Sequence, residues 1–339
     1  MRGVATPPDA KRRSEIVKLF AGQDTAELGV LLRCAACVAV ATLLCACAAD
    51  PFRAVTQHSV AAAIELDGTP FFPQREYQCG PAALATVLVD SGVQVHPDEL
   101  TPRVYLPGRL GSLQPELLAA SRELGRIPYV IPPEFPALLA EVSRGHPVLV
   151  LQNLGVKLKP AWHYAVVVGY SRERGEVILR SGTDERRVTR AGVFANTWRR
   201  GGNWGVVALE PGELPATDDS AGYLRAVAAA EAVGRADLSE PSYTAAAGRW
   251  PDASLAWLGL GNSAYARGEP ETAEHLYRRA LQVDSGNAAT LNNLASAVAK
   301  LGRCREAREL LHTAMALPDL HQPIREQLEQ SRVEIDACK

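Results

Sequence analysis

The sequence predicts an α+β domain followed by an all-α repeat array. Apolar residues follow helical spacing between about residues 82 and 143, and four short β-branched runs come after them, at 146–152, 163–170, 175–181 and 203–209. Helices first and strands afterwards favour an antiparallel sheet over alternating parallel units. Beyond residue 220 the strand signals vanish, and small and apolar residues recur with a period of about 34 residues.

Composition excludes several classes of function. The 339 residues are 47% hydrophobic, which is enough for two domains with cores of their own. Lys and Arg total 36 against 38 Asp and Glu, and no basic run is interleaved with aromatic residues, so we expect no nucleic-acid partner. No His, Cys or acidic pair shows metal-ligand spacing, so we expect no metal and no cofactor.

The N-terminal segment predicts export. Four of the seven cysteines (Cys34, Cys37, Cys45 and Cys47) lie in one apolar run that stops at Asp50. The run has the length of a signal-peptide core and is short for a membrane span. Its end, Leu44-Cys45-Ala46-Cys47, resembles a bacterial lipobox, which implies a lipid on Cys47, with Cys45 as the competing acceptor.

We therefore expect residues 1–47 to be an extension plus a lipoprotein signal peptide, and residues 48–70 to be a tether. Ala48, rather than aspartate, follows Cys47, which favours an outer-membrane lipoprotein facing the periplasm. The alternatives are a plain secretory signal or an uncleaved short anchor.

Three helices are predicted in the first domain. The one from Ala82 is apolar nearly all round and ends near Ser91-Gly92, so it belongs in a core. The stretch "GSLQPELLAASRELG" predicts a second helix with Ser112 as its N-cap, and "EFPALLAEVSRG" predicts a third.

The second half resembles tetratricopeptide repeats. In the middle copy the pattern is carried by Trp257, Leu260, Gly261, Gly268, Ala273, Tyr277 and Ala280, and it recurs in phase on both sides. We expect a linker over 211–220, three repeats over 221–321 and a capping helix over 322–339. The resemblance implies a groove that binds a protein partner.

The last two cysteines are predicted to pair. Cys304 begins the second helix of the third repeat, and Cys338 ends the capping helix, which should run antiparallel to it. In an oxidising compartment the two ends should meet in a disulfide.

Cys79 is the candidate nucleophile. In "PQREYQCGPAALATVL" it opens the buried helix, where the unpaired amides of a helix N-terminus stabilise a thiolate. The alternative is a small buried side chain without chemistry, which is the common fate of a free cysteine.

A base and an oxyanion donor are found in the same domain. Among the histidines His58, His96, His146, His163, His275, His312 and His321, only His163 opens a long apolar strand, "HYAVVVGY". A side-chain amide that precedes the cysteine can stabilise the oxyanion, and Gln74 is the better candidate than Gln78.

These motifs, "Q-x4-CGPAAL" and "WHYAVVVGY", resemble papain-like cysteine peptidases, and among them the bacteriocin-processing (double-glycine leader) peptidases. The resemblance covers about residues 71–210 and implies that Cys79 is the nucleophile, His163 the general base and Gln74 the oxyanion residue. Ser181 stands where the family carries an aspartate, with Asp184 as the alternative third member. Leader cleavage is not implied, because the chain lacks the transporter helices.

Two functions follow. The first is a cell-envelope cysteine peptidase whose repeats bind polypeptide substrate or a protein partner, held at the membrane by its lipid. The second is a catalytically weak or inactive scaffold, which the missing acid at Ser181 favours.

Overall fold

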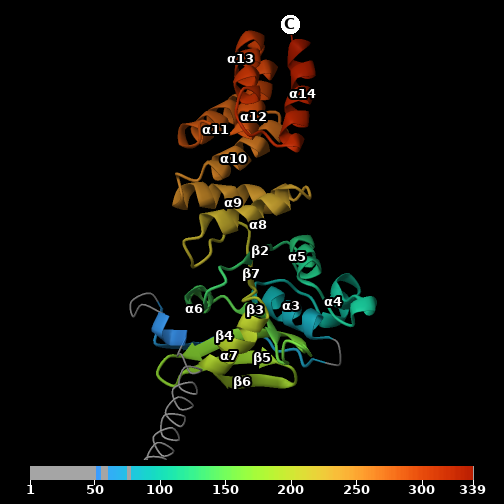
Figure 1. Ribbon diagram of the computed structural model, residues 1–339, viewed down its shortest axis with the longest axis vertical. Helices are drawn as coiled ribbons and strands as arrows, with labels where there is room; N and C mark the ends of the chain where they lie inside the picture. Colours follow the sequence, from blue (N-terminus) through green and yellow to red (C-terminus); the bar gives the residue numbers. More distant parts are fainter. Residues whose placement is uncertain (1–50, 55–59, 75–77, 339) are drawn as a thin grey trace, which may run out of the picture. The chain divides into compact units, whose positions relative to one another are not determined.

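The computed structural model describes residues 51–54, 60–74 and 78–338. Its seven-stranded sheet has the order β2-β7-β3-β4-β5-β6, with β1 also paired to β4, and every pair is antiparallel (Figure 1). The predicted α+β class with an antiparallel sheet is confirmed. The strands are β1 (Ala63–Glu65), β2 (Ile127–Val130), β3 (Val148–Asn153), β4 (Trp162–Ser171), β5 (Glu176–Ser181), β6 (Asp184–Arg190) and β7 (Gly205–Leu209).

Helices cover both faces of the sheet. They are η1 (Pro51–Ala54), α3 (Cys79–Asp90), α4 (Pro97–Val104), η2 (Pro107–Arg109), α5 (Gln114–Glu123), α6 (Phe135–Arg144) and α7 (Ala191–Arg200). In β4, Tyr164 and Val166 belong to the core under α3, α4 and α5, whereas Ala165 and Val167 belong to the core with α6 and α7. This alternation explains why β4 is a continuous apolar run.

The repeat region is a run of seven helices. They are α8 (Ser220–Glu231), α9 (Ala236–Arg249), α10 (Ser254–Ala266), α11 (Pro270–Val283), α12 (Ala288–Lys300), α13 (Cys304–Met315) and α14 (Gln322–Asp336), stacked in chain order (Figure 1). Small residues permit the close packing that the repeat pattern predicts. A Cβ on Gly261, for example, would overlap the ring of Tyr277.

Part of the segment expected to be a tether, 48–70, is packed against the domain, so that prediction is wrong for Phe52 and for β1. Phe52 is only 5% exposed, and its ring contacts Phe135 and Tyr170. β1 extends the sheet by pairing with β4. Three residues are too few to show a period, which is why no strand was predicted here. Cys47, the expected lipid site, lies outside the described residues.

Ser112 is not the cap of its helix, which corrects the sequence prediction. α5 begins at Gln114 with Leu113 at the N-cap position and no side-chain cap bond. The Ser112 side chain lies instead against the start of α3, beside Gly80. Tertiary packing therefore outweighs the local preference of serine for capping.

The expected linker, 211–220, contains no helix or strand before Ser220, but it is firmly held. The backbone amides of Ala216 and Thr217 donate to Oε1 of Glu141, at 3.0 and 3.4 Å. Glu141, in α6, is completely buried. The connection between the sheet domain and the repeats is thus part of the packed structure.

At the end of the repeats, Cys304 and Cys338 form a disulfide with their Cα atoms 5.6 Å apart. This distance lies in the range that disulfides require. Over the part of the chain that the structure describes, no helix has the length and apolar character needed to cross a membrane.

Candidate active site

Cys79 is the first residue of α3, a helix that is buried from Gly80 to Leu88. Its thiol forms no disulfide and is partly exposed. α3 packs on β4 and on the neighbouring strands. The sulfur therefore sits at the N-terminal, positive end of a helix that the core fixes in place.

His163 lies at the start of β4, opposite Gln152 of β3. Its Nε2 is 2.9 Å from Oγ of Ser181, the last residue of β5. Burial lowers the pKa of His163, and the positive charge of Arg187 on β6 acts in the same direction. The imidazole is therefore held by a hydroxyl and is biased toward its neutral form.

The geometry distinguishes Ser181 from Asp184 as the residue that positions the imidazole of His163. Ser181 is buried and is the hydrogen-bond partner of His163. Asp184 begins β6, is exposed, and has its carboxylate 3.9 Å from the guanidinium of Arg187. Within the described residues Asp184 makes no hydrogen bond to His163, so the imidazole is positioned by a neutral partner.

Gln74 reaches the same end of β4. Its backbone amide donates to the carbonyl of Gly182 at 2.9 Å, and its Nε2 donates to the carbonyl of Tyr164 at 3.3 Å. The side-chain amide thus lies beside the backbone that carries His163. Gln78 occupies the N-cap position of α3 and makes no side-chain cap bond.

Three further residues gather near Cys79. Burial raises the pKa of Tyr164, and the nearby Cys79 and Glu116 act in the same direction. The Tyr164 hydroxyl donates to the carbonyl of Ser112 at 3.3 Å. Oγ of Ser112 and Oε2 of Glu116 are both buried without a hydrogen-bond partner, so two polar atoms of residues around Tyr164 are left unsatisfied.

Sequence reasoning missed this group for different reasons. Tyr164 directly follows His163 in the same motif and could have been noticed there. Ser112 and Glu116 carry no such signal, because only the packing of α5 against α3 brings this part of the chain to the helix that begins with Cys79.

Cys79 and His163 are not hydrogen-bonded to each other among the described residues. Both are placed by β4: His163 is part of the strand, and Cys79 packs against the apolar cluster that contains Tyr164. Ser181 is bonded to Nε2 of His163, and Nδ1 of the same ring has no hydrogen bond among the described residues. Catalytic hydrogen bonds are often long in free enzymes and tighten when substrate binds.

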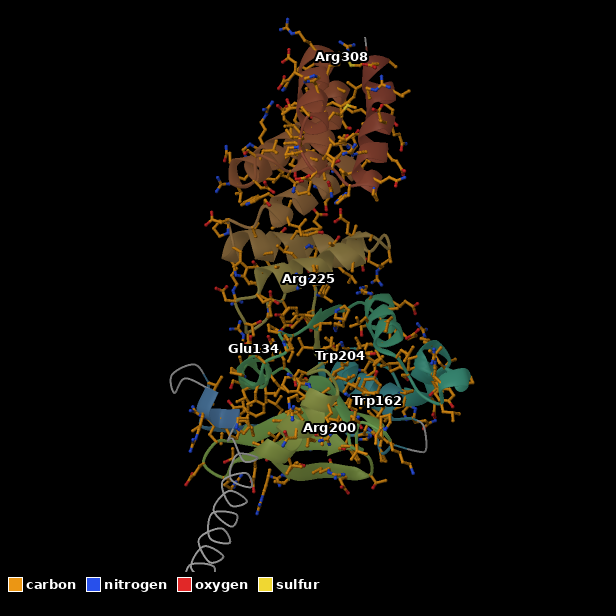
Figure 2. The ribbon with its side chains drawn as sticks, in the orientation of Figure 1. Glu134, Trp162, Arg200, Trp204, Arg225 and Arg308 are labelled. Atoms are coloured by element: carbon orange, nitrogen blue, oxygen red, sulfur yellow. A yellow bond between two sulfur atoms is a disulfide. The ribbon has the colours of Figure 1, made fainter. Side chains whose placement is uncertain are left out.

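An exposed apolar rim precedes His163 on the β3–β4 hairpin. Leu154, Val156, Leu158 and Trp162 are all largely exposed, and Figure 2 labels Trp162. Asn153 holds this hairpin, because its Oδ1 accepts from the amides of Gly155 and Ala161, each at 3.0 Å. The hairpin that leads into His163 therefore exposes four apolar side chains.

No group of His, Cys, Asp or Glu side chains that could hold a metal ion occurs in the described part of the chain. The chemistry available at this end of β4 is that of a thiol, an imidazole, hydroxyls, a carboxylate and an amide.

Comparison with known protein families identifies both halves of the chain. Residues 66–206 match the Peptidase_C39 like family, and residues 223–289 and 264–319 each match a tetratricopeptide repeat family. The chain thus carries a C39-like peptidase domain followed by tetratricopeptide repeats. No curated relative matches the chain.

Solved structures resemble one half or the other. The peptidase domain of Streptococcus ComA, a bifunctional ABC transporter involved in quorum sensing, aligns at 19% identity over 42% of this chain and 98% of its own, with a TM-score of 0.34. A Bacillus anthracis protein described as C39-like peptidase aligns at 15% identity over 44% of this chain and 98% of its own, with a TM-score of 0.37. The Yersinia enterocolitica secretion chaperone SycD, solved with a peptide of the translocator YopD, aligns at 20% identity over 36% of this chain and 94% of its own, with a TM-score of 0.33.

Proposed function

We propose that the C39-like domain is a cysteine peptidase in which Cys79 is the nucleophile and His163 the general base. The observation that carries the proposal is the hydrogen bond between Nε2 of His163 and Ser181, which leaves Nδ1 available to accept the thiol proton. The position of Cys79 at the first turn of the buried helix α3 supports the same assignment.

The reaction follows from these roles. Nδ1 of His163 removes the proton of the Cys79 thiol, and the sulfur attacks the carbonyl carbon of a peptide bond. The backbone amide of Cys79 and the side-chain amide of Gln74 donate to the oxyanion. His163 then protonates the departing amine, and water, activated by the same imidazole, hydrolyses the thioester.

The lowered pKa of His163 fits a base that begins neutral. In the tautomer that the mechanism requires, Nε2–H donates to Oγ of Ser181, 2.9 Å away, and Nδ1 is unprotonated. A hydroxyl supplies no charge to stabilise the imidazolium, so we expect slower turnover than an aspartate would give.

The substrate in this proposal is a polypeptide. The apolar rim of Leu154, Val156, Leu158 and Trp162 supports contact with apolar side chains near the cleaved bond. The tetratricopeptide repeats, through their groove, supply a second surface for the substrate or for a protein partner.

The cellular setting is also part of the proposal. We infer a lipoprotein of the bacterial cell envelope, anchored through Cys47 and facing the periplasm, on the lipobox-like sequence at residues 44–47. A disulfide between Cys304 and Cys338 fits an oxidising compartment.

The second candidate is a binding scaffold that lacks efficient catalysis. Ser181 favours it, because the partner of the candidate base is neutral. In that case the repeats provide the function, and the C39-like domain serves as a folded support.

Site-resolved labelling with iodoacetamide, combined with hydrolysis of a peptide library, distinguishes the two. A peptidase should lose hydrolysis in Cys79→Ala and in His163→Ala, and His163→Ala should also slow alkylation of Cys79 at neutral pH. His312→Ala, in α13 of the repeats, is the matched control. Hydrolysis that survives Cys79→Ala would reject the thiol mechanism, and wild-type protein that cleaves nothing would favour the scaffold.

A further inference from the structure

A cavity of about 550 Å³ lies where the sheet domain meets the first repeat helix. One wall comes from α5, β2 and the residues after β2, and the other comes from α8. This volume is in the range of ligand pockets, which often form where domains meet. Most of its lining is apolar, from Leu118, Pro128, Val130, Ile131, Pro132 and Pro133.

The two walls are fixed relative to each other. The rings of Tyr129 on β2 and Tyr223 on α8 pack edge to face with centroids 6.3 Å apart. The Tyr129 hydroxyl is bonded to Oγ1 of Thr217 at 2.7 Å and donates to Asp219 at 3.0 Å. One apolar core runs from the sheet into α8, α9 and α10, so the cavity is formed before any ligand arrives.

Two arginines give the cavity an excess of positive charge. Nε of Arg122, on α5, is buried and has no hydrogen-bond partner. Arg225, on α8 and labelled in Figure 2, forms no ion pair with any described residue. The one carboxylate in the lining, Asp219, already accepts from Tyr129 and from the amide of Gly222.

Neighbouring charges do not neutralise these arginines. The pocket on the other side of Arg122 contains Arg103 and Arg235, which are paired with Glu123 and Asp237. Burial lowers the pKa of Arg122, as expected for a guanidinium that has lost water without gaining an anion. The guanidinium of Arg122 lines the cavity and has no hydrogen-bond or ion-pair partner among the described residues, so a ligand carboxylate there would supply the missing anion.

We propose that this cavity binds the C-terminal carboxylate of a peptide whose last residue is apolar. A carboxylate matches the planar donor fork of arginine, and the proline and aliphatic walls match an apolar side chain. Cleavage of a peptide bond creates such an end, so the junction could hold a product of the neighbouring domain. Binding itself needs no Cys79 chemistry and is independent of the proposed peptidase activity.

The test uses the full chain with Cys79→Ala, so that no probe is cleaved. Two fluorescein-labelled hexapeptides ending in leucine are compared by fluorescence anisotropy, one with a free carboxylate and one amidated. We expect the free acid to bind at least tenfold more tightly. Arg122→Gln and Arg225→Gln should each weaken the acid about tenfold and leave the amide unchanged, whereas Arg305→Gln, on the exposed surface of α13, should have no effect.

Three outcomes would overturn the proposal. In the first, acid and amide bind equally. In the second, binding is lost in Asn293→Ala, which alters the groove of the repeats, and is unchanged in Arg122→Gln. In the third, dodecanoate displaces the peptide at far lower concentration than an unlabelled copy does, which would make the site one for a fatty acid. Thermal melting of each variant checks that it is folded.

Discussion

Replacing Gly80 with alanine should disturb the candidate active site more than its small size suggests. Gly80 follows the candidate nucleophile and lies against Ser112, so that an added Cβ would come within 2.6 Å of the Ser112 Cβ. Ordinary carbon contacts begin near 3.4 Å, so about 0.8 Å must be regained by moving α5 away from α3. Overpacking of this kind typically costs about 1–3 kcal/mol.

A second substitution removes the obstacle. Ser112→Gly deletes both atoms that the new methyl group would meet, and the Ser112 hydroxyl has no hydrogen bond to lose. Urea unfolding should therefore show Gly80→Ala destabilised by about 1–3 kcal/mol and the double variant close to wild type. Site-resolved alkylation of Cys79 should slow in the single variant and recover in the double variant.

Additive effects would refute this reasoning. If Gly80→Ala and Ser112→Gly each destabilise the protein and the double variant shows the sum, the two residues do not touch in the way described. Normal stability of Gly80→Ala would refute it equally.

Three other predictions concern charge and covalent linkage. Because the pKa of His163 is lowered, the acid limb of the activity profile should fall below pH 6.5, and Arg187→Gln should move it upward. Burial alone would lower the pKa of His146, but its hydrogen bonds to Glu141 and Glu213 raise it to about 9. The contribution of protonated His146 to the free energy of unfolding should therefore be complete below pH 6.5 and be lost as the pH rises through 9. Urea unfolding measures it, and Glu141→Gln should lower the free energy of unfolding by about 3 kcal/mol. Cys338→Ser should lower the stability of the repeats by about 3–4 kcal/mol, a loss that reductant mimics in the wild-type protein.

The parts of the fold that follow short-range rules were predictable. The start of α3 follows from Cys-Gly-Pro before an apolar run, and β3, β4, β5 and β7 follow from β-branched residues between turn residues. The helix pairs of the repeats follow from spacing alone, because the same small and apolar positions recur with a period of about 34 residues.

The rest depends on contacts between segments far apart in the chain. β6 is exposed along its length and has no apolar alternation, so its pairing with β5 is what makes it a strand. α4 begins with a capping box formed by His96 and Glu99, a signal that was present but had no apolar periodicity beside it. The prediction of a tether over 48–70 was wrong for the same reason, since Phe52 is buried by aromatic rings that lie far away in the sequence.

The candidate site shows the same division. Cys79, His163 and Gln74 were found by motif, because their roles require particular residue types near a helix start and a strand start. The hydrogen bond of His163 to Ser181, rather than an approach by Asp184, depends on the β5–β6 turn. The charge of Arg187 lowers the pKa of His163, and the charge of Glu116 raises the pKa of Tyr164. Nothing in the local sequence of Arg187 or Glu116 indicates these effects.

The carboxylate of Glu141 makes the connecting segment indispensable to the domain that precedes it. A protein shortened to end before Ala216 would keep every strand of the sheet and still lose both amides that hold one oxygen of a fully buried acid. If Glu213 were removed too, His146 would lose one of its two carboxylate partners. Fragments intended for biochemistry should therefore extend at least through Thr217, and one cut at the end of β7 should be poorly folded even though its sheet is complete.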